Sequence, residues 1–182
     1  MTTSVLKTER LILRPLSIAD ADTIFESWTS DPKVAKYMNW NLHQRVEDTK
    51  EWLRFEEENI GKSTNYTWGF VLKETGELFG SGGINYNSDY EMFELGYNIM
   101  QKYWNQGFTT EAAKKIIDFA IKELGIKRLF CRHAKDNIAS GKVIEKLGFT
   151  YQNNGTYTSL DGKRTFLSKE YLLEINDQYV NL

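Results

Sequence analysis

The chain has 182 residues, of which 41% are hydrophobic and 14% aromatic, a globular composition that excludes a disordered chain. Lys and Arg number 23 against 25 Asp and Glu, so the formal net charge is −2, which argues against a general nucleic-acid-binding protein. This length predicts a single domain over residues 1–182.

The first half of the chain predicts one strand, two helices and then three strands. "RLILRPL" is a short apolar strand ended by Pro15. "SIADADTIFESWT" follows with Ser17 and Asp20 in a variant of the capping box, and its apolar residues have helical spacing. "DPKVAKYMNW" breaks this helix, and "HQRVEDTKEWLRFEEEN" predicts a second, surface helix. "YTWGFVL", "LFGSGGINYN" and "EMFELGYNIM" then predict an antiparallel meander.

The period of the apolar pattern changes after Gly107. A helix of several turns is predicted from there to Gly125, followed by the strand "KRLFCRHA". "NIASGKVIEKL" predicts a short helix that ends at Gly148, and "FTYQNNGTYT" with "TFLSKEYLL" predicts a final hairpin. The order is therefore βααβββαβαββ, which indicates a mixed α+β fold.

The cysteine and histidine content limits the chemistry. Cys131 is the only cysteine, so no internal disulfide forms, and a buried strand residue is favoured over a nucleophile. His43 and His133 are the only histidines, too few ligands for a zinc site of the usual kind, so no metal is expected. No apolar run approaches the ~18 residues of a membrane helix, and the N-terminus lacks a signal-peptide core. We therefore expect a cytoplasmic protein with no membrane contact.

The segment "NQGFTT" lies between the strand "ELGYNI" and the long predicted helix. A helix N-terminus has unpaired N–H groups and partial positive charge, so it favours phosphate. Gly107 would let a ligand approach the backbone closely. The alternative is that Gly107, Thr109 and Thr110 only start and cap a helix. This stretch alone leaves both interpretations open.

The second candidate segment is "NIASGKVIEKLGF". Asn137 follows a strand, so it serves either as a helix N-cap or as an amide that bonds a ligand. Ser140, on the first turn, is either a surface residue or a proton donor. Lys142 and Lys146 are four residues apart on one helix face, beside the phosphate site if the two strands are neighbours.

Taken together, "ELGYNIMQKYWNQGFTTEAAKKIIDFA" and "NIASGKVIEKLGF" resemble the Gcn5-related N-acetyltransferase (GNAT) superfamily. The opening "TERLILRPLSIADADTIFESWTSDPKVAKYM" is similar to its branch of ribosomal-protein N-terminal alanine acetyltransferases. The resemblance covers Thr8 to about Leu173. It implies a twisted mixed sheet of about seven strands, splayed between the fourth and fifth, with about four helices. Acetyl-CoA, the co-substrate, would lie in that split.

The resemblance also assigns residues to acetyl-CoA. The pantetheine would pair with the backbone around Tyr97, Asn98, Ile99 and Met100. The pyrophosphate would bind the N–H groups of Gln106, Gly107, Phe108, Thr109 and Thr110, with Lys142 nearby. Asn137 would bond the pantetheine, and Ser140 would lie close to the sulfur.

Three positions depart from the superfamily pattern. Trp104 and Thr109 replace the first and last residues of the usual pyrophosphate loop; Trp104 is common in the branch, and Thr109 keeps its N–H. Ile144 occupies the position where many members have a general-acid tyrosine. Ser140 is what the branch offers instead, either as an acid or as a contact to the cofactor.

Amide formation needs a neutral amine. At pH 7 an α-amine needs about 1 kcal/mol to lose its proton, whereas a lysine amine needs about 4.6 kcal/mol. Glu94 in "FELGYNI" is the candidate base, acting through water; the alternative is an outward-facing strand glutamate. A strand N–H near Tyr97 or Asn98 could stabilise the oxyanion. Candidates for the acceptor wall are Tyr37, Trp40, Trp68 and Tyr86, although such aromatic residues are more often part of the core.

The predicted function is transfer of an acetyl group from acetyl-CoA to a primary amine by direct attack in a ternary complex. The acceptor would be a protein N-terminus or a small-molecule amine, and the sequence does not choose between them. The alternative function is a non-catalytic module that binds or senses acyl-CoA. No nucleic-acid or membrane partner is expected, and a homodimer remains open because the sequence carries no interface signal.

Overall fold

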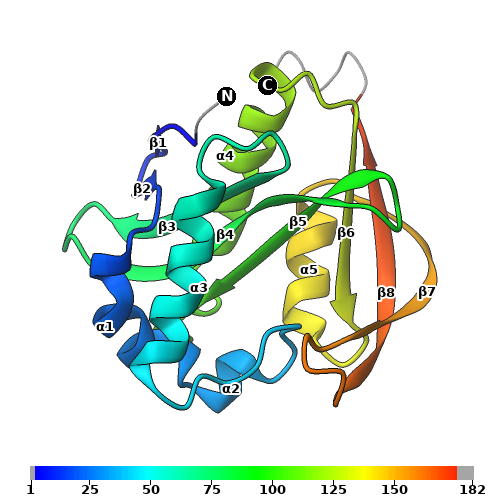
Figure 1. Ribbon diagram of the computed structural model, residues 1–182. Helices are drawn as coiled ribbons and strands as arrows, with labels where there is room; N and C mark the ends of the chain where they lie inside the picture. The colour runs from blue at the N-terminus through cyan, green and yellow to red at the C-terminus, as the bar shows by residue number, and fades with distance from the viewer. Residues whose placement is uncertain (1–2, 176–182) are drawn as a thin grey trace.

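The computed structural model describes residues 3–175. In that range the strands form one eight-stranded mixed sheet in the order β1-β2-β3-β4-β5-β6-β8-β7 (Figure 1). Neighbouring strands are antiparallel except for β5 and β6, which are parallel. The strands are β1 (Leu6–Lys7), β2 (Leu11–Arg14), β3 (Asn65–Leu72), β4 (Leu78–Asn87), β5 (Met92–Ile99), β6 (Arg128–Ala134), β7 (Thr150–Thr158) and β8 (Thr165–Glu174). The mixed α+β fold is confirmed. Seven strands were expected, and the eighth is the two-residue strand β1.

The first expected helix consists of three short segments, η1 (Ile18–Asp20), α1 (Ala21–Ile24) and η2 (Phe25–Thr29). The Ser17 N–H donates to Asp20 Oδ2 at 3.0 Å, as the capping pattern predicted. Asp20 also accepts from both terminal nitrogens of Arg14, at 2.8 and 2.7 Å. This pairing ties the end of β2 to the start of the helix.

Two further helices precede the meander. The helix α2 (Pro32–Ala35) forms in the segment expected to be a break, because Asp31 accepts from the Lys33 N–H and Pro32 occupies the first turn. The helix α3 (Val46–Asn59) is the expected surface helix. Three more helical segments follow β5: η3 (Gln101–Tyr103), α4 (Phe108–Lys122) and α5 (Ile138–Lys146). Both α4 and α5 end just before the predicted glycines.

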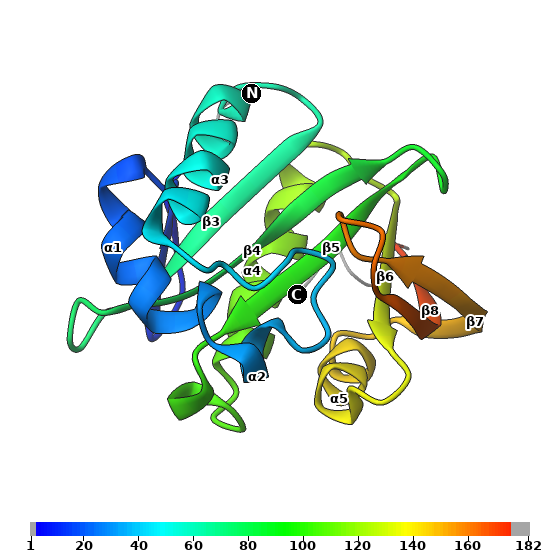
Figure 2. The same ribbon diagram turned by 60° about the horizontal axis from the view of Figure 1, so that its bottom comes forward.

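Helices cover both faces of the sheet, with α1 and α3 on one face and α4 on the other (Figures 1 and 2). Each face has its own core. The cluster on the α4 side includes Phe70, Phe79 and Ile116, and the cluster on the α1–α3 side includes Ile24, Trp28 and Leu53. Burial of these large apolar side chains is the main stabilising term of the fold.

Trp68, expected on the acceptor wall, belongs to the core instead. Its side chain is 0% exposed, and its ring centre lies 5.1 Å from that of Phe119 on α4. The indole N–H donates to the Ser4 carbonyl at 2.8 Å. The prediction was wrong because alternation along β3 turns Trp68 toward α4, where its large apolar surface is covered.

The sheet opens between β5 and β6, the fourth and fifth strands of the expected order. Their pairing comprises Phe93 with Leu129 and Glu94 with Phe130. Beyond Glu94 the two strands diverge, and α5 lies beside the end of β6 (Figure 2). The expected splay is therefore confirmed, and it leaves the last residues of β5 with an open edge.

Candidate active site

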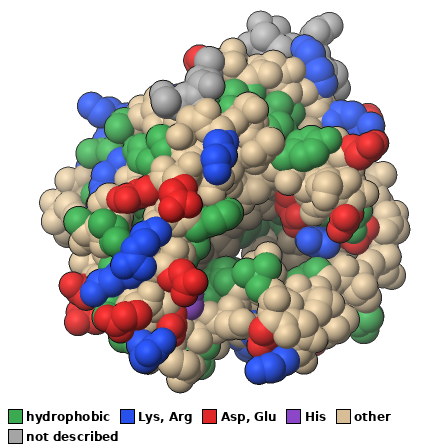
Figure 3. All heavy atoms as spheres, in the orientation of Figure 1, with side chains coloured by type: hydrophobic (Ala, Val, Ile, Leu, Met, Phe, Trp, Pro, Cys, Tyr) green, Lys and Arg blue, Asp and Glu red, His purple; other side chains and the backbone are tan. Residues whose placement is uncertain are grey.

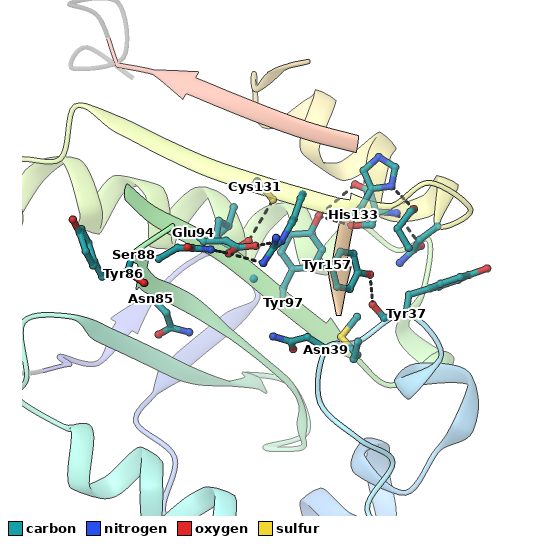
Figure 4. A pocket seen from close by; sticks show the side chains of 18 residues that line it. Tyr37, Asn39, Asn85, Tyr86, Ser88, Glu94, Tyr97, Cys131, His133 and Tyr157 are labelled. Atoms are coloured by element: carbon teal, nitrogen blue, oxygen red, sulfur yellow. Dashed lines mark hydrogen bonds and ion pairs between the residues drawn. The ribbon is translucent and has the colours of Figure 1, made fainter. Parts of the chain in front are cut away.

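A cavity of about 450 Å³ occupies the point where β5 and β6 part. In the space-filling view this face of the molecule is hollowed near its centre (Figure 3). The walls come from β4, β5, β6, the start of α5 and the segment after α2 (Figure 4). The lining residues are Tyr37, Met38, Asn39, Asn85, Tyr86, Asn87, Ser88, Glu94, Leu95, Gly96, Tyr97, Cys131, Arg132, His133, Ala134, Asn137, Ser140 and Tyr157.

Glu94 faces this cavity as one half of an ion pair. Its Oε1 lies 2.9 Å from Arg132 Nε, and its Oε2 accepts from Asn87 Nδ2 at 2.7 Å. The two charged side chains are 23% and 19% exposed, so the pair meets both the cavity and solvent. Glu94 is therefore not a simple outward-facing strand residue. A guanidinium and an amide hold its carboxylate in place.

A second carboxylate lies behind this pair. Glu170 on β8 is directly opposite Arg132 in register and is 5% exposed. It accepts from the Tyr90 hydroxyl at 2.6 Å and from Asn153 Nδ2 at 2.7 Å. Burial, together with the bond to Glu170, raises the pKa of Tyr90 to about 12, so this phenol stays protonated. The strand register thus places a second, buried carboxylate opposite the arginine that pairs with Glu94.

Tyr97 crosses the split and reaches α5. Its hydroxyl oxygen lies 3.1 Å from Ser140 Oγ and 3.3 Å from the Ser140 carbonyl oxygen. Burial raises the pKa of Tyr97, so the phenol carries its proton. The buried Cys131 Sγ donates to the Leu95 carbonyl at 3.3 Å where the strands diverge, and burial raises the pKa of this thiol. Cys131 is the buried strand residue that was expected.

The backbone of β5 shows which of its groups reach the open edge. The Asn98 carbonyl faces Gly80 on β4, where an added Cβ would lie 2.5 Å from it, and the Met100 N–H donates to the Phe79 carbonyl. Because strand backbone groups alternate, those of Tyr97 and Ile99 face the split. The Ile99 carbonyl accepts the Trp104 indole N–H at 3.0 Å. Four residues were predicted to pair with pantetheine, but the Asn98 carbonyl and the Met100 N–H face β4 instead of the open edge.

The start of α4 leaves its first N–H groups without a side-chain cap. Gly107 is the N-cap residue and has φ +81°, a left-handed conformation that favours glycine. Thr109 and Thr110 follow inside the first turn, so the cap by a threonine that the alternative interpretation required does not form. Phe108 contributes its N–H but buries its ring against Phe79. The segment is therefore a helix start with open donors.

Arg10, which the sequence analysis did not single out, lies at this helix start. Its guanidinium bonds to the Gln106 carbonyl at 3.2 Å and to Glu111 Oε2 at 2.7 Å, and stacks over the Phe108 ring at 4.2 Å. It adds a positive charge beside Gly107, partly neutralised by Glu111. No motif signals it, because Arg10 and Glu111 are about a hundred residues apart.

Asn137 acts as a helix cap, since its Oδ1 accepts from the Ser140 N–H at 3.3 Å. It also lines the cavity, as Ser140 does. Lys142 is exposed on α5 and lies outside the cavity lining. The structure brings Asn137 and Ser140 together with Glu94 and Tyr97, but not Lys142.

The acceptor side of the cavity includes two of the four predicted aromatic residues. Tyr37 and Tyr86 line it, whereas Trp40 packs against the core under α1 and α3. Tyr157 was missed; its hydroxyl donates to the Tyr37 carbonyl at 2.6 Å, and its ring lies 5.2 Å from the Arg132 guanidinium. The strand pattern gave no sign of Tyr157, because β7 reaches the cavity only through its pairing with β8.

Arg164 fixes the same wall from outside. Its terminal nitrogens donate to the carbonyls of Ala35, Met38 and Trp40 at 3.3, 3.3 and 2.8 Å. These bonds hold the segment after α2 against the β7–β8 hairpin. The Leu160 N–H adds a backbone bond to the Asn39 carbonyl at 2.7 Å. This wall of the cavity is thus held together by segments that lie far apart in the chain.

Neither a membrane helix nor a metal cluster is found among residues 3–175. No helix there is long and apolar enough to cross a bilayer. No group of three or more His, Cys, Asp or Glu side chains in that range is placed to hold a metal ion.

Comparison with known proteins places the chain among acetyltransferases. The family model for the acetyltransferase (GNAT) domain matches residues 10–150. A curated relative, the uncharacterized N-acetyltransferase p20 of Bacillus licheniformis, is 31% identical over 145 residues, which cover 79% of this chain and 81% of that protein.

Two solved structures share the fold. A putative ribosomal-protein-serine acetyltransferase from Vibrio cholerae superposes with a TM-score of 0.82 at 21% identity, covering 96% of this chain and 100% of that one. The microcin C7 self-immunity acetyltransferase MccE, solved with acetyl-CoA and AMP, superposes with a TM-score of 0.78 at 16% identity, covering 92% and 94%.

Proposed function

Because this chain belongs to the acetyltransferase (GNAT) family and is an acetyl-CoA-dependent acyltransferase, we propose that it acetylates a primary amine held in the cavity beside Glu94. The observation that carries the proposal is the meeting of Glu94 and Ser140 at one cavity, where the sheet splits. Glu94 comes from β5 and Ser140 from α5, so the two face each other only in the folded chain.

The residues around the split fit acetyl-CoA. The uncapped N–H groups of α4 and the left-handed Gly107 form a cradle for the pyrophosphate, and Arg10 adds a cation beside it. The Tyr97 and Ile99 backbone groups at the open edge suit the amides of pantetheine. Asn137 and Ser140 lie at the far end of that path. When bound, the cofactor supplies an activated acetyl thioester.

Glu94 serves as the base, through water, for the amine that enters the cavity. Arg132 and Asn87 fix its carboxylate in place, so the acceptor meets a preorganised group. The Tyr97 N–H, at the open edge, is the donor that stabilises charge developing on the carbonyl oxygen. The Asn98 N–H, which faces β4, does not serve this role. The Ser140 hydroxyl bonds the sulfur.

The carboxylate in the cavity lining favours a cationic acceptor. Glu94 lines the cavity, and the buried Glu170 lies opposite Arg132 in register on β8. The remaining wall is rich in amides and hydroxyls, including Asn39, Asn85 and Ser88. An α-amine of a protein N-terminus or a small polar amine therefore fits, the former with the smaller cost of deprotonation.

The decisive experiment measures release of free thiol from acetyl-CoA with a panel of amines: peptides with different N-termini, lysine-containing peptides with blocked N-termini, polyamines and amino sugars. Turnover with at least one amine is expected. Glu94→Gln should then lower kcat about 100-fold or more, as loss of a general base does.

Glu174→Gln is the matched control, because Glu174 is also a strand glutamate near an arginine, 3.8 Å from Arg128, but lies outside the cavity. It should leave kcat unchanged. Tight binding of acetyl-CoA without turnover of any amine would replace the proposal with the binding-module function.

A further inference from the structure

The Tyr97 side chain links the two halves of the split sheet through Ser140. Tyr97 projects from β5, and Ser140 lies in the first turn of α5, which follows β6. The two hydroxyl oxygens are 3.1 Å apart, so either can donate to the other. Figure 4 shows the phenol extending from β5 under Cys131 toward this helix. Nothing in the proposed function uses this side chain.

The surroundings of the Tyr97 and Ser140 hydroxyls indicate which of the two donates the hydrogen bond between them. Burial raises the pKa of Tyr97, so the phenol keeps its proton and can donate one hydrogen bond. Its two acceptors are Ser140 Oγ at 3.1 Å and the Ser140 carbonyl at 3.3 Å. When the phenol donates to Oγ, the serine proton is released to point into the cavity, where Ser140 is a lining residue.

The position of the pair relative to the reaction follows from the backbone. Glu94, Tyr97 and Ser140 all line the cavity, the first two from β5 and Ser140 from α5 on the other side of the split. A hydroxyl there faces the leaving sulfur. The helix position four residues further on carries Ile144, which is 0% exposed and has no proton to give.

We propose that Tyr97 is a positioning residue, whose phenol donates to Ser140 Oγ and so directs the serine hydroxyl at the sulfur of the departing coenzyme A. This inference rests on the proposed function. Two hydroxyls in series polarise one another, so the serine proton becomes a stronger donor to a developing thiolate than an isolated serine would be.

The step balances without any proton being consumed by the pair. The amine nitrogen forms a bond to the acetyl carbon, and the carbon–sulfur bond breaks with its electron pair on sulfur. The amine loses its proton through water to Glu94. Tyr97 and Ser140 keep their own protons, and only the Ser140 hydroxyl donates a hydrogen bond to the thiolate. The thiolate has an ordinary pKa of about 8.5 and takes a proton from solvent on release.

The test combines kinetics with binding of coenzyme A itself. Tyr97→Phe should lower kcat about 3- to 10-fold, with the KM for acetyl-CoA changed less than about 2-fold, as expected for loss of one neutral hydrogen bond. The same substitution in a Ser140→Ala background should have no further effect on kcat, because Tyr97 acts through Ser140. Replacing Tyr97 with 3-fluorotyrosine, which keeps a donor, should preserve kcat.

The binding readout does not need turnover. In the wild type, the affinity for free coenzyme A should rise about 3- to 10-fold more between pH 7 and 9.5 than the affinity for S-methyl coenzyme A, because the chain stabilises the bound thiolate. Tyr97→Phe and Ser140→Ala should each abolish that difference. Tyr66→Phe is the control, since Tyr66 is another buried strand tyrosine, 2% exposed, outside the cavity.

The outcomes separate this inference from the proposed function. A raised KM for acetyl-CoA and a lowered melting temperature, with kcat and the thiol pH profile unchanged, would show that Tyr97 only bridges the split, and would overturn the inference. Absence of turnover with a normal thiol pH profile would reject the proposed function and leave the Tyr97–Ser140 chain supported. Absence of any pH effect in the wild type would also overturn the inference.

Discussion

Arg132 Nε lies 2.9 Å from Glu94 Oε1, so the carboxylate that faces the cavity is paired with a guanidinium from the next strand. Glu94 is the last β5 residue paired with β6, opposite Phe130, and Arg132 lies two residues beyond Phe130 on β6. The pair therefore stands at the apex of the split. The pair lies close to both the proposed acceptor wall and the open edge of β5. The split of the sheet therefore brings the proposed base to the place where amine and thioester would meet.

Removal of the guanidinium should lower the activity. Arg132→Leu takes away the Nε atom that lies 2.9 Å from Glu94 Oε1, so the carboxylate is no longer held in place beside the cavity and kcat should fall about 10-fold. Steady-state rates at saturating acetyl-CoA measure the loss, and an unchanged kcat would contradict this role of Arg132. Arg128→Leu, on the same strand but outside the cavity, should leave kcat unchanged.

A side chain at Gly107 should block coenzyme A. Gly107→Val places a branched side chain at φ +81° in front of the open N–H groups of α4, and the affinity for coenzyme A should fall at least about 10-fold. The strained backbone also costs about 1–2 kcal/mol of stability. Gly76→Val, at φ +73° in the β3–β4 turn, carries the same strain away from the site.

Calorimetric titration with coenzyme A separates the two effects. Both variants should melt at lower temperature, whereas only Gly107→Val should lose affinity. Equal affinities for the two variants would contradict the assignment of the α4 start as the pyrophosphate site.

Loss of Arg164 should loosen the acceptor wall. Arg164→Ala removes three bonds to the carbonyls of Ala35, Met38 and Trp40, so the segment that carries Tyr37 is no longer held against the hairpin. The KM for the amine should rise about 5-fold or more, because loss of each hydrogen bond to a charged donor changes an equilibrium constant several-fold. The KM for acetyl-CoA should stay within about 2-fold. Initial rates with each substrate varied in turn measure both constants.

Lys163→Ala is the neighbouring control, because its side chain is 82% exposed. It should change neither constant. An equal rise of both KM values in Arg164→Ala would indicate a general loss of structure rather than a wall specific to the acceptor.

His133 should make the fold less stable in mild acid. Burial lowers its pKa below the unfolded value of about 6.5, and its ring is satisfied in the neutral form, with Nδ1–H donating to the Ala134 carbonyl at 2.8 Å and Nε2 3.2 Å from the Tyr171 hydroxyl. Below pH 6.5 the unfolded chain therefore binds a proton that the folded chain does not.

The free energy of unfolding should accordingly fall as the pH drops from 7 toward 5, by up to about 1.4 kcal/mol per pH unit for this residue. Urea titrations at several pH values measure the slope. His133→Gln should reduce it. The pKa of His43 is also lowered by burial, so part of the slope should remain in that variant. A slope unchanged by the substitution would contradict the assignment.

The order of the elements was predictable because it depends on local patterns. Apolar spacing and the glycines at 107, 125 and 148 placed α4 and α5, and both were found. The two-residue β1 and four-residue α2 were missed because so few residues carry no periodic signal. The predicted helix from Ser17 onward became three segments, since its winding depends on how Trp28 packs beneath α3.

The candidate site was predicted only in part. Glu94, Gly107, Asn137 and Ser140 were named from motifs and lie where those motifs required a cavity or a helix start. Trp68 was misplaced, and Arg10, Arg132 and Tyr157 were missed. Each of these residues has its place because of a contact with an element far away in the sequence, which the spacing of neighbouring residues does not predict. Lys142 lies outside the cavity lining, and its contact with the cofactor stays a prediction.

The sequence by itself determined which segments are helices and strands, where a helix starts with a glycine, and which family the two motifs resemble. Only the tertiary structure decided that Glu94 pairs with Arg132, that Tyr97 reaches Ser140 and that Trp68 is buried under α4. The physical reason is that alternation along a strand tells which side chains share a face. Which helix covers that face, and where two parallel strands part, follow from packing between residues far apart in the chain.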